Sequence, residues 1–558
     1  MYALFGIFNV CIPLLYGEGS ENARKRLEEV IAKGNAYIAD LRLTDPRDDK
    51  DRIADTKGGL FRGPSDWVLD HADFRQWHDT HEARLLWVKG DPGKGKTMLL
   101  ITIVEELERQ LERRRRTASS LTALSYFFCQ GTDGKLNNAT AVLRGLIYLL
   151  CIQQPLLASH LRARYDHAGT NLFQDANSFY VLSGILKSMI QDERLQKVYL
   201  IVDALDECIA ERDQLLRFIA RCAAISPRVK WIVSSRNVTD IENLLEINGS
   251  EVKLSLEVTQ NAEQVARAVE AFIDHKLSNI RSLRDEHNMM RRVRDAMREK
   301  ANGTFLWVAL VARELEKAQS WRALGLVEKM PATLDLFYDL MMNRAQQSEE
   351  GEWEYCQLVL STATLAYRPL HLAELAIISG LPVDIFKAHT NRIREVVDLC
   401  GSFLTVKDSI VYLIHQSVKD YLSGRAAATV FPSGVSQVHR SIFTQSIQAL
   451  STRLRRNMYG LPYLGVPIND IRVPKPDPLA GAHYSCIHWA RHFCDACPGR
   501  NSFEREDLKR IEGFIRSSFL YWLEAVALLR NASESIVSIR RLRTFLEVRG
   551  LVKLPGRY

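Results

Sequence analysis

Residues 84–97 of the chain read RLLWVKGDPGKGKT, and this stretch decides the fold of the segment around it. Arg84–Lys89 is a short apolar-rich run bounded by Gly90, which is typical of a buried strand, and the residues after Thr97 have a helical pattern. Gly90–Thr97 fits the pattern G-x-x-x-x-G-K-S/T, whose backbone amides cradle phosphate at a helix N-terminus. The order strand, glycine loop, helix therefore predicts a phosphate-binding loop.

The chemistry of such a loop assigns a role to each of its main residues. Glycines let the backbone amides turn inward, where side chains would block the phosphates. Lys96 is expected to neutralise the β- and γ-phosphates, and the Thr97 hydroxyl to hold Mg²⁺. We therefore predict a P-loop site for ATP or GTP with Mg²⁺. Its nucleotide-binding residues are Gly90, Asp91, Pro92, Gly93, Lys94, Gly95, Lys96, Thr97 and Met98.

A second buried strand, placed beside the first, is expected to supply the carboxylate for magnesium. Val198–Val202 is a continuous apolar run, as in a parallel strand covered on both faces, and it leads directly into Asp203. Asp203 is the predicted Mg²⁺ ligand. Asp206 and Glu207 lie beyond the strand end, where a carboxylate could orient or deprotonate the attacking water, so both are predicted to be catalytic.

Two further runs, Leu124–Phe128 and Val229–Val233, fit strands of the same sheet. Arg236 closely follows the second run and so lies at the carboxyl edge, where ligands of open α/β sheets collect. We predict that Arg236 senses the γ-phosphate as a third catalytic residue. The alternative is a surface salt bridge.

The stretches WVKGDPGKGKT, VYLIVDALDE and WIVSSRN, in this order and spacing, resemble the NACHT family of signal-transducing (STAND) P-loop ATPases. The resemblance covers about Arg84 to Asn237. It implies an α/β nucleotide-binding domain, with a parallel sheet and helices on both faces, that works as a switch. One departure is Ala204, where many members carry glycine, and we expect little consequence because alanine is also small.

The segments after the sheet predict a helical lid and a winged-helix domain. Ala262–Leu277 and Met290–Lys317 have the periodicity of amphipathic helices. Family members often carry a Gly-X-Pro there, whose proline packs near the adenine, but residues 301–307 of this chain read ANGTFLW. Further on, Phe403–Val406 and Ser409–Ile414 predict two strands joined by a tight turn, as in the wing of a winged-helix domain.

Residues 415–422, HQSVKDYL, resemble the winged-helix motif H-x-S-F/V-x-D/E-F/Y of the family. The resemblance implies that His415 reaches the β-phosphate of a diphosphate bound in the resting state. From the residues alone, a single histidine at a strand end is more often a packing residue. Contact of His415 with nucleotide is therefore the prediction, and packing is the alternative.

The two ends of the chain carry weaker patterns. Residues 2–31 are similar to the C-terminal end of the fungal heterokaryon-incompatibility (HET) domain and predict a remnant of it, followed by a polar linker at Asp45–Thr56. The tail from about Ser433 has helical patterns similar to the segment that precedes repeats in fungal NACHT proteins. We find no repeat of 20 to 50 residues.

The sequence therefore predicts six parts of the chain. They are a HET remnant (1–35), a linker with lead-in helices (36–80), the NACHT nucleotide-binding domain (81–240), a helical lid (241–330), a winged-helix domain (331–430) and a C-terminal helical domain (431–558).

Charge and composition exclude several partners. The chain has 74 basic and 67 acidic residues, a net charge of +7 spread thinly over 558 residues, so we expect no nucleic-acid partner. Apolar runs are far shorter than the roughly 18 to 20 residues of a membrane span, so none is expected. Ten cysteines without a regular framework, and no secretory signal, predict a cytoplasmic location.

A cluster of histidines and cysteines in the tail includes a Cys-x-x-Cys and could bind zinc. Its residues are His483, Cys486, His488, His492, Cys494 and Cys497. Because they lie in an apolar helical stretch, with no second Cys-x-x-Cys at zinc-ribbon distance, buried thiols are the favoured interpretation.

The expected function is a nucleotide-dependent switch of NOD-like receptor type, in fungal non-self recognition, heterokaryon incompatibility or programmed cell death. Exchange of diphosphate for triphosphate would open the lid and winged-helix domains and permit homo-oligomerisation, and slow hydrolysis would reset the switch. The alternative is a truncated scaffold that binds nucleotide without turnover. The sequence names neither the activating signal nor the protein effector.

Overall fold

The computed structural model describes residues 22, 37–57, 63, 65–117, 122–245, 251–347, 351–382, 390–463, 466–467, 470–499 and 504–548. The chain divides into two compact units, Met1–Glu328 and Lys329–Tyr558, and each is described by itself. The predicted HET remnant at residues 2–31 lies outside the described residues, apart from Asn22.

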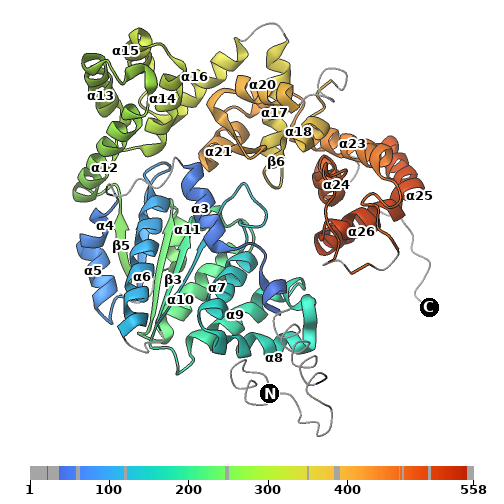
Figure 1. The fold of residues 1–558 in the computed structure, drawn as a ribbon, viewed down its shortest axis with the longest axis horizontal. Coiled ribbons are helices and arrows are strands. Elements are labelled where there is room, and N and C mark those ends of the chain that lie inside the picture. The colour runs from blue at the N-terminus through green and yellow to red at the C-terminus, as the bar shows by residue number, and fades with distance from the viewer. Residues whose placement is uncertain are drawn as a thin grey trace. The chain divides into compact units, whose positions relative to one another are not determined.

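A five-stranded sheet forms the centre of the first unit (Figure 1). All its neighbouring strands are parallel, in the order β2-β3-β4-β1-β5. The strands predicted from apolar runs are confirmed. A strand whose two faces are both covered by helices needs a continuous apolar sequence. The strands are β1 (Leu85–Lys89), β2 (Thr122–Phe128), β3 (Lys197–Asp203), β4 (Val229–Ser235) and β5 (Glu251–Ser255).

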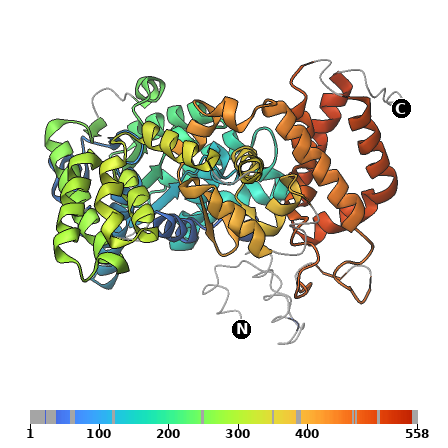
Figure 2. The same ribbon diagram turned by 90° about the horizontal axis from the view of Figure 1, so that it is seen from above.

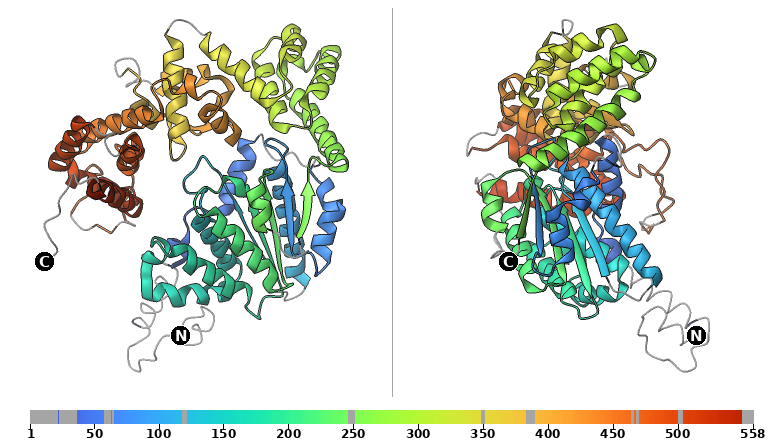
Figure 3. Two further views of the ribbon diagram at one scale, coloured as in Figure 1. Left: turned by 180° about the vertical axis from the view of Figure 1, so that it is seen from behind. Right: turned by 90° about the vertical axis from the view of Figure 1, so that its left-hand side faces the viewer.

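Helices cover both faces of this sheet (Figure 3), so the predicted α/β fold class is confirmed. Among them, α6 packs against β2, β3 and β4, α7 against β2, and α10 against β4. The helices are α6 (Lys96–Thr117), α7 (Ala139–Gln153), α8 (Ala158–Ala168), α9 (Ser178–Ile190), α10 (Arg212–Ile225) and α11 (Thr239–Leu245).

The expectation that the strand before Asp203 lies beside β1 is wrong. β4 lies between β3 and β1 and pairs with both of them. Consecutive strands are neighbours in most sheets but not in all, and a crossover helix leaves the order open. The functional consequence is small, because the carboxyl ends of parallel strands still meet at one edge.

The sheet also extends beyond residue 240, where the sequence analysis ended the nucleotide-binding domain. β5 pairs in parallel with β1, so residues 251–255 belong to the sheet and not to a lid that begins at 241. Val252 and Leu254 are buried while Lys253 between them is exposed. This alternation is typical of an edge strand with one covered face, and a search for continuous apolar runs misses it.

The charged stretch Asp45–Thr56, predicted to be a linker, is instead helix α3 (Pro46–Thr56). Asp45 caps the helix by accepting from the N–H of Arg47, and Pro46 stands at the first helical position. Polarity misled the prediction, because α3, which packs against β2 and α6, buries the charged residues Asp49 and Lys50 together with few apolar side chains.

The predicted lead-in helices are confirmed as α4 (Trp67–Asp70) and α5 (Ala72–Asp79). A fully buried lysine on β4, Lys230, holds the end of α5 to the sheet. Its ammonium donates to the carbonyls of Trp77 at 2.8 Å, of Ala83 at 2.6 Å and of Thr80. Burial lowers the pKa of Lys230 to about 8, so the group keeps its proton at neutral pH.

Both amphipathic stretches predicted after the sheet are helical. The second stretch is interrupted where Asn302 and Gly303 take positive φ angles of 44° and 63°, which end one helix before the next begins. The helices are α12 (Thr259–Ser278), α13 (His287–Ala301), α14 (Phe305–Lys317) and α15 (Ser320–Lys329).

The second unit begins with helices around a small antiparallel sheet of order β6-β8-β7. The predicted pair of strands with a tight turn is confirmed, with Asp408 and Ser409 in the turn at positive φ. The strands are β6 (Leu370–His371), β7 (Leu404–Lys407) and β8 (Ile410–Leu413). The helices are α16 (Leu334–Gln346), α17 (Glu352–Leu365), α18 (Leu372–Ile378), α20 (Thr390–Leu399), α21 (Gln416–Ser423) and α22 (Ala427–Val430).

The tail is helical, as predicted. Figure 2 shows its helices packed together, with α23 along α24 and α25, and α24 along α26. They are α23 (Val435–Arg453), α24 (His483–Ala496), α25 (Arg505–Leu528) and α26 (Ala532–Val548). None of the helices described in either unit is long and apolar enough to cross a bilayer.

Within the described part of the chain, no group of three or more His, Cys, Asp or Glu side chains is placed to hold a metal ion, so the tail shows no zinc site. His492 lies inside α24 and pairs with His439 at 2.8 Å and with the Tyr484 hydroxyl at 2.7 Å. The cysteines of the cluster are buried thiols outside any disulfide: Cys486, Cys494 and Cys497.

Replacing Lys230 with alanine should lower the free energy of unfolding of the first unit by about 3 kcal/mol, because the buried carbonyls of Trp77 and Ala83 and that of Thr80 lose a charged donor. Lys197→Ala is the matched control, since its ammonium donates to a single carbonyl, that of His78. Urea unfolding followed by tryptophan fluorescence measures both. Equal losses in the two variants would contradict the anchoring role of Lys230.

Candidate nucleotide site

The turn between β1 and α6 has the backbone geometry that its glycines allow. Gly93 and Gly95 have φ angles of 79° and 87°, a region that L side chains rarely adopt. Apart from His415, the predicted nucleotide-binding residues belong to this turn or to the start of α6: Gly90, Asp91, Pro92, Gly93, Lys94, Gly95, Lys96, Thr97 and Met98. The structure therefore brings this part of the predicted site together.

The start of the loop is tied to both neighbouring strands. The N–H of Gly90 donates to the carbonyl of Ser235 on β4 at 3.3 Å. The N–H of Asp91 donates to Glu257 Oε1, just beyond β5, at 2.7 Å. Glu257 was not predicted because β5 was not predicted. The alternating pattern of β5, followed by a carboxylate at its end, is the sequence signal for this residue.

The residues that link α13 to α14 lie directly on the loop. The N–H of Phe305 donates to the Gly93 carbonyl at 2.9 Å, and the Lys94 ammonium donates to the Asn302 carbonyl at 2.7 Å. A Cβ on Gly95 would stand 2.9 Å from the Phe305 ring, and a Cβ on Gly93 would stand 2.9 Å from Leu306 Cβ. Both glycines are thus required by the packing of this segment.

Lys96 is held by the loop that it is expected to serve. Its ammonium donates to the carbonyls of Gly90 at 2.5 Å and Asp91 at 3.0 Å. Burial lowers the pKa of Lys96, while the negative charges of Asp206 and Asp203 oppose that shift. The lysine therefore lies within electrostatic reach of Asp203, the last residue of β3, and of Asp206 beyond it.

The two predicted magnesium ligands are both buried, and each has one defined partner. Ser234 on β4 donates from Oγ to Asp203 Oδ1 at 2.5 Å and accepts from the N–H of Ala204 at 2.9 Å. Thr97 Oγ1 accepts from the ammonium of Lys57 at 2.7 Å. The sequence analysis assigned no role to either Ser234 or Lys57.

These residues fit a magnesium ion. Mg²⁺ prefers oxygen ligands and is usually held by one or two protein groups together with phosphate oxygens and water. Thr97 and Asp203 offer a hydroxyl and a carboxylate, and the Lys57 ammonium shows that a cation can lie against Thr97. Thr97 and Asp203 would hold the ion, whose charge would offset that of the phosphates.

Two of the predicted catalytic residues, Asp206 and Arg236, form an ion pair. Arg236 Nε lies 3.0 Å from Asp206 Oδ2, and the N–H of Arg236 donates to Asp206 Oδ1 at 3.1 Å. The salt bridge that was the alternative for Arg236 is therefore present. Sensing of a γ-phosphate by Arg236 stays a prediction.

Glu207 is held on the loop after β2. Its Oε2 accepts from the N–H of Gly131 at 2.8 Å. Burial, and then the nearby charge of Asp206, raises the pKa of Glu207 to about 7. A carboxyl group that exchanges its proton near neutral pH suits general-base chemistry.

The turn that presents these carboxylates carries backbone strain. Ala204 has a φ of 54°, in the left-handed region, directly before the short helix Leu205–Glu207. An L residue in that region costs about 1 kcal/mol or more, which glycine avoids. The expectation that alanine has little consequence there overlooked this strain, because it considered only size.

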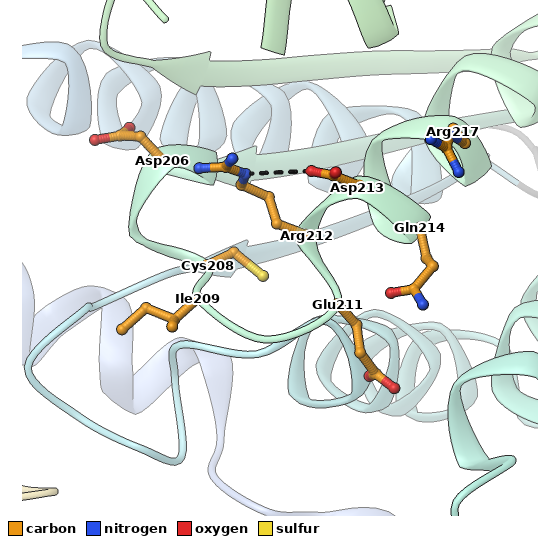
Figure 4. Close-up of a pocket in the computed structure, with 8 residues that line it drawn as sticks. All are labelled: Asp206, Cys208, Ile209, Glu211, Arg212, Asp213, Gln214 and Arg217. Atoms are coloured by element: carbon orange, nitrogen blue, oxygen red, sulfur yellow. Dashed lines mark ion pairs between the residues drawn. The ribbon is translucent and has the colours of Figure 1, made fainter. Parts of the chain in front are cut away.

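A pocket of about 600 Å³ opens beside the same turn (Figure 4). The Arg212 guanidinium lies between Asp206 and Asp213, with Nε 3.7 Å from Asp213 Oδ1 (Figure 4). The lining residues are Asp206, Cys208, Ile209, Glu211, Arg212, Asp213, Gln214 and Arg217. None of them belongs to the phosphate loop, and Asp206 connects the pocket to the candidate site.

His415 belongs to the second unit, where it caps helix α21. Its Nδ1 accepts from the N–H of Ser417 at 3.1 Å and lies 2.8 Å from the Ser417 hydroxyl. That hydroxyl also bonds to the hydroxyl of Tyr338 at 2.9 Å. These contacts match the packing alternative, and contact of His415 with a phosphate stays a prediction.

The raised pKa of Glu207 makes stability depend on pH. In the unfolded chain this carboxyl ionises near pH 4.5, whereas in the folded chain it keeps its proton to about pH 7. The folded state binds more protons between these values, so stability falls as pH rises through this window. Glu207→Gln removes the effect. Relative to wild type, the variant should gain about 1 to 3 kcal/mol between pH 5 and pH 8, measured by denaturant unfolding without nucleotide.

Glu211→Gln provides the matched control for this experiment. Glu211 is exposed and undergoes the same chemical change. Its stability difference from wild type should stay constant over the same pH range. A flat difference for Glu207→Gln as well would contradict the raised pKa.

Comparison with known proteins gives one family model and one curated relative that cover the residues of this site. The family model described as "Nephrocystin 3, N-terminal" matches residues 63–236, which contain the phosphate loop and β1 to β4. The vegetative incompatibility protein HET-E-1 of Podospora anserina is 45% identical over 563 residues, covering 98% of this chain and 41% of that protein. This chain therefore spans less than half the length of that relative.

Solved structures with a similar fold are more distant in sequence. A Walker-type ATPase of Pyrococcus abyssi matches with a TM-score of 0.31 and 13% identity, covering 69% of this chain and 99% of that one. The Orc2 protein of Aeropyrum pernix, solved in ADPNP and ADP complexes, matches with a TM-score of 0.30 and 11% identity, covering 66% of this chain and 94% of that one. Over nearly its whole length, the chain is thus similar to part of a fungal incompatibility protein.

Proposed function

We propose that this chain is the nucleotide-binding part of a cytoplasmic signalling switch of the NACHT type, within the STAND P-loop ATPases. One observation carries the proposal: the phosphate loop with Lys96 and Thr97 shares a sheet edge with Asp203 and Glu207. The similarity to an incompatibility protein supports a setting in fungal non-self recognition or programmed cell death. The reduced state of the nine described cysteines supports the cytoplasmic location.

The chemistry proposed for the site is slow hydrolysis of ATP or GTP. Lys96 binds the β- and γ-phosphates, and Thr97 and Asp203 position Mg²⁺, which supplies charge neutralisation. Glu207 accepts a proton from the attacking water, which its pKa of about 7 permits. Arg236 turns from Asp206 toward the γ-phosphate.

The switch works through differential contacts with diphosphate and triphosphate. The segment that contains Phe305 rests on the phosphate loop, so a change in loop occupancy alters the packing of the lid. His415, in a winged-helix domain of residues 331–430, contacts the diphosphate and holds a closed resting form. Exchange for triphosphate opens the protein and permits self-association.

Lys96→Ala should weaken binding of ATP and GTP at least 100-fold, because the phosphates lose their main cation. Glu207→Gln should bind triphosphate with wild-type affinity but retain it unhydrolysed. Calorimetric titration and single-turnover hydrolysis of labelled nucleotide measure the two effects. Lys89→Ala, at the end of β1 and paired with Glu242, is the control for losing a nearby lysine.

Two outcomes of this experiment would count against the switch. Binding of nucleotide by Lys96→Ala as tight as by wild type would refute the phosphate site itself. Equal and negligible hydrolysis by Glu207→Gln and wild type would favour the alternative, a scaffold that binds nucleotide without turnover.

His415→Ala should release bound diphosphate about tenfold faster than wild type, because a contact specific to the diphosphate state is lost. The variant also loses a helix cap, and His371→Ala controls for that loss. His371 caps α18 in the same way, with its Nδ1 accepting from the N–H of Ala373 at 3.2 Å. Stopped-flow release of labelled ADP or GDP compares the three proteins. Equal release rates would contradict contact of His415 with the diphosphate.

A further inference from the structure

A lysine outside every nucleotide motif lies against the predicted magnesium ligand. Lys57 Nζ donates to Thr97 Oγ1 at 2.7 Å, across 40 residues of sequence. Lys57 follows helix α3, and its own N–H closes that helix by donating to the carbonyl of Ile53. The hydroxyl expected to bind a divalent cation is therefore already bonded to a monovalent one.

The charge of Lys57 reaches the other groups of the site. Burial is the main cause of the lowered pKa of Lys96, and the positive charge of Lys57 adds to that lowering. Burial is also the main cause of the raised pKa of Glu207, and the charge of Lys57 opposes that rise. The Lys57 ammonium is thus one of the cations of the candidate site.

The packing of α3 fixes where Lys57 begins. Ile53 and Ala54 are buried, and Arg52 Nη1 donates to Gln130 Oε1 at 3.1 Å. Gln130 is the neighbour of Gly131, whose N–H holds Glu207. Helix α3 is therefore attached both to the core of the unit and to the loop that donates a hydrogen bond to the candidate general base, Glu207.

We propose that Lys57 is a stand-in for magnesium at Thr97, an inference that rests on the proposed function. A hydroxyl oxygen can accept from an ammonium or bind Mg²⁺, but both cations on one oxygen would repel each other at close range. The Lys57 ammonium therefore offsets phosphate charge when nucleotide is bound without metal. Mg²⁺ would displace this ammonium from Thr97. The flexible four-carbon stem of Lys57 lets the ammonium move away while α3 stays packed.

This arrangement gives the site a specific dependence on Mg²⁺. Without metal, the Lys57 ammonium offsets part of the phosphate charge, so nucleotide stays bound. When Mg²⁺ is present, it would bind Thr97 in place of the Lys57 ammonium. The gain in nucleotide affinity would be smaller, because a favourable cation is displaced first. Removing Lys57 should therefore weaken metal-free binding and increase the factor by which Mg²⁺ tightens nucleotide.

The test compares wild type with Lys57→Met, and Lys57→Gln provides a second neutral side chain should the first variant fold poorly. Lys50→Met is the control, because Lys50 lies on the same helix and pairs with Glu108 at 3.5 Å. Affinity for ATP carrying a fluorescent ribose label is measured in EDTA and at increasing Mg²⁺. Circular dichroism checks that each variant is folded.

Lys57→Met should bind about tenfold more weakly than wild type in EDTA and within about twofold of wild type at saturating Mg²⁺. Lys50→Met should match wild type in both conditions. The same Mg²⁺ factor in wild type and Lys57→Met would overturn the inference. An equal loss with and without Mg²⁺ would overturn it too, by making Lys57 a simple phosphate ligand.

The two proposals fail in different ways. Wild-type protein that binds no labelled nucleotide in EDTA or in Mg²⁺ would end the proposed function itself. If wild-type protein binds nucleotide and Mg²⁺ tightens binding equally in wild type and the Lys57 variants, only the proposed role of Lys57 is refuted.

Discussion

Parallel pairing of β3, β4 and β1 is the constraint on which the candidate site depends. The register aligns Val202, Val233 and Trp87 across the three strands, so the residues that follow them emerge at one edge of the sheet. Asp203 then meets Ser234, and the glycine loop begins beside them. Because side chains alternate between the faces of a strand, a slip of one residue would turn Asp203 to the opposite face of the sheet and break its contact with Ser234.

Much of this arrangement could be predicted from the sequence, because its signals are local and redundant. The runs before Gly90 and Asp203 are apolar because their strands are covered on both faces, and the glycine pattern follows from the positive φ angles that the loop adopts. The position of the phosphate loop and the ends of four strands follow from such rules. The pair of strands β7 and β8 does as well, but Ser409, predicted to begin the second strand, lies in the turn with Asp408 at positive φ.

The remaining features depend on contacts between distant segments, which composition and spacing do not encode. Helix α3 has a polar sequence although it buries Asp49 and Lys50 as well as apolar residues, so its composition alone does not separate it from a linker. Lys57 reaches Thr97 only because of the packing of α3. Likewise, Ser234 gained a role only once β4 was found between β3 and β1.

The contact of Phe305 and Leu306 with the phosphate loop has a consequence for how this protein can change. A mutation that adds a side chain at Gly93 or Gly95 would collide with Phe305 or Leu306 of helix α14, so a further change within the loop alone could not rescue it. Compensation would need coordinated replacements on two segments that are about two hundred residues apart in the chain. Such double requirements leave few single-step evolutionary routes, and the loop is expected to drift more slowly than the helices that surround it.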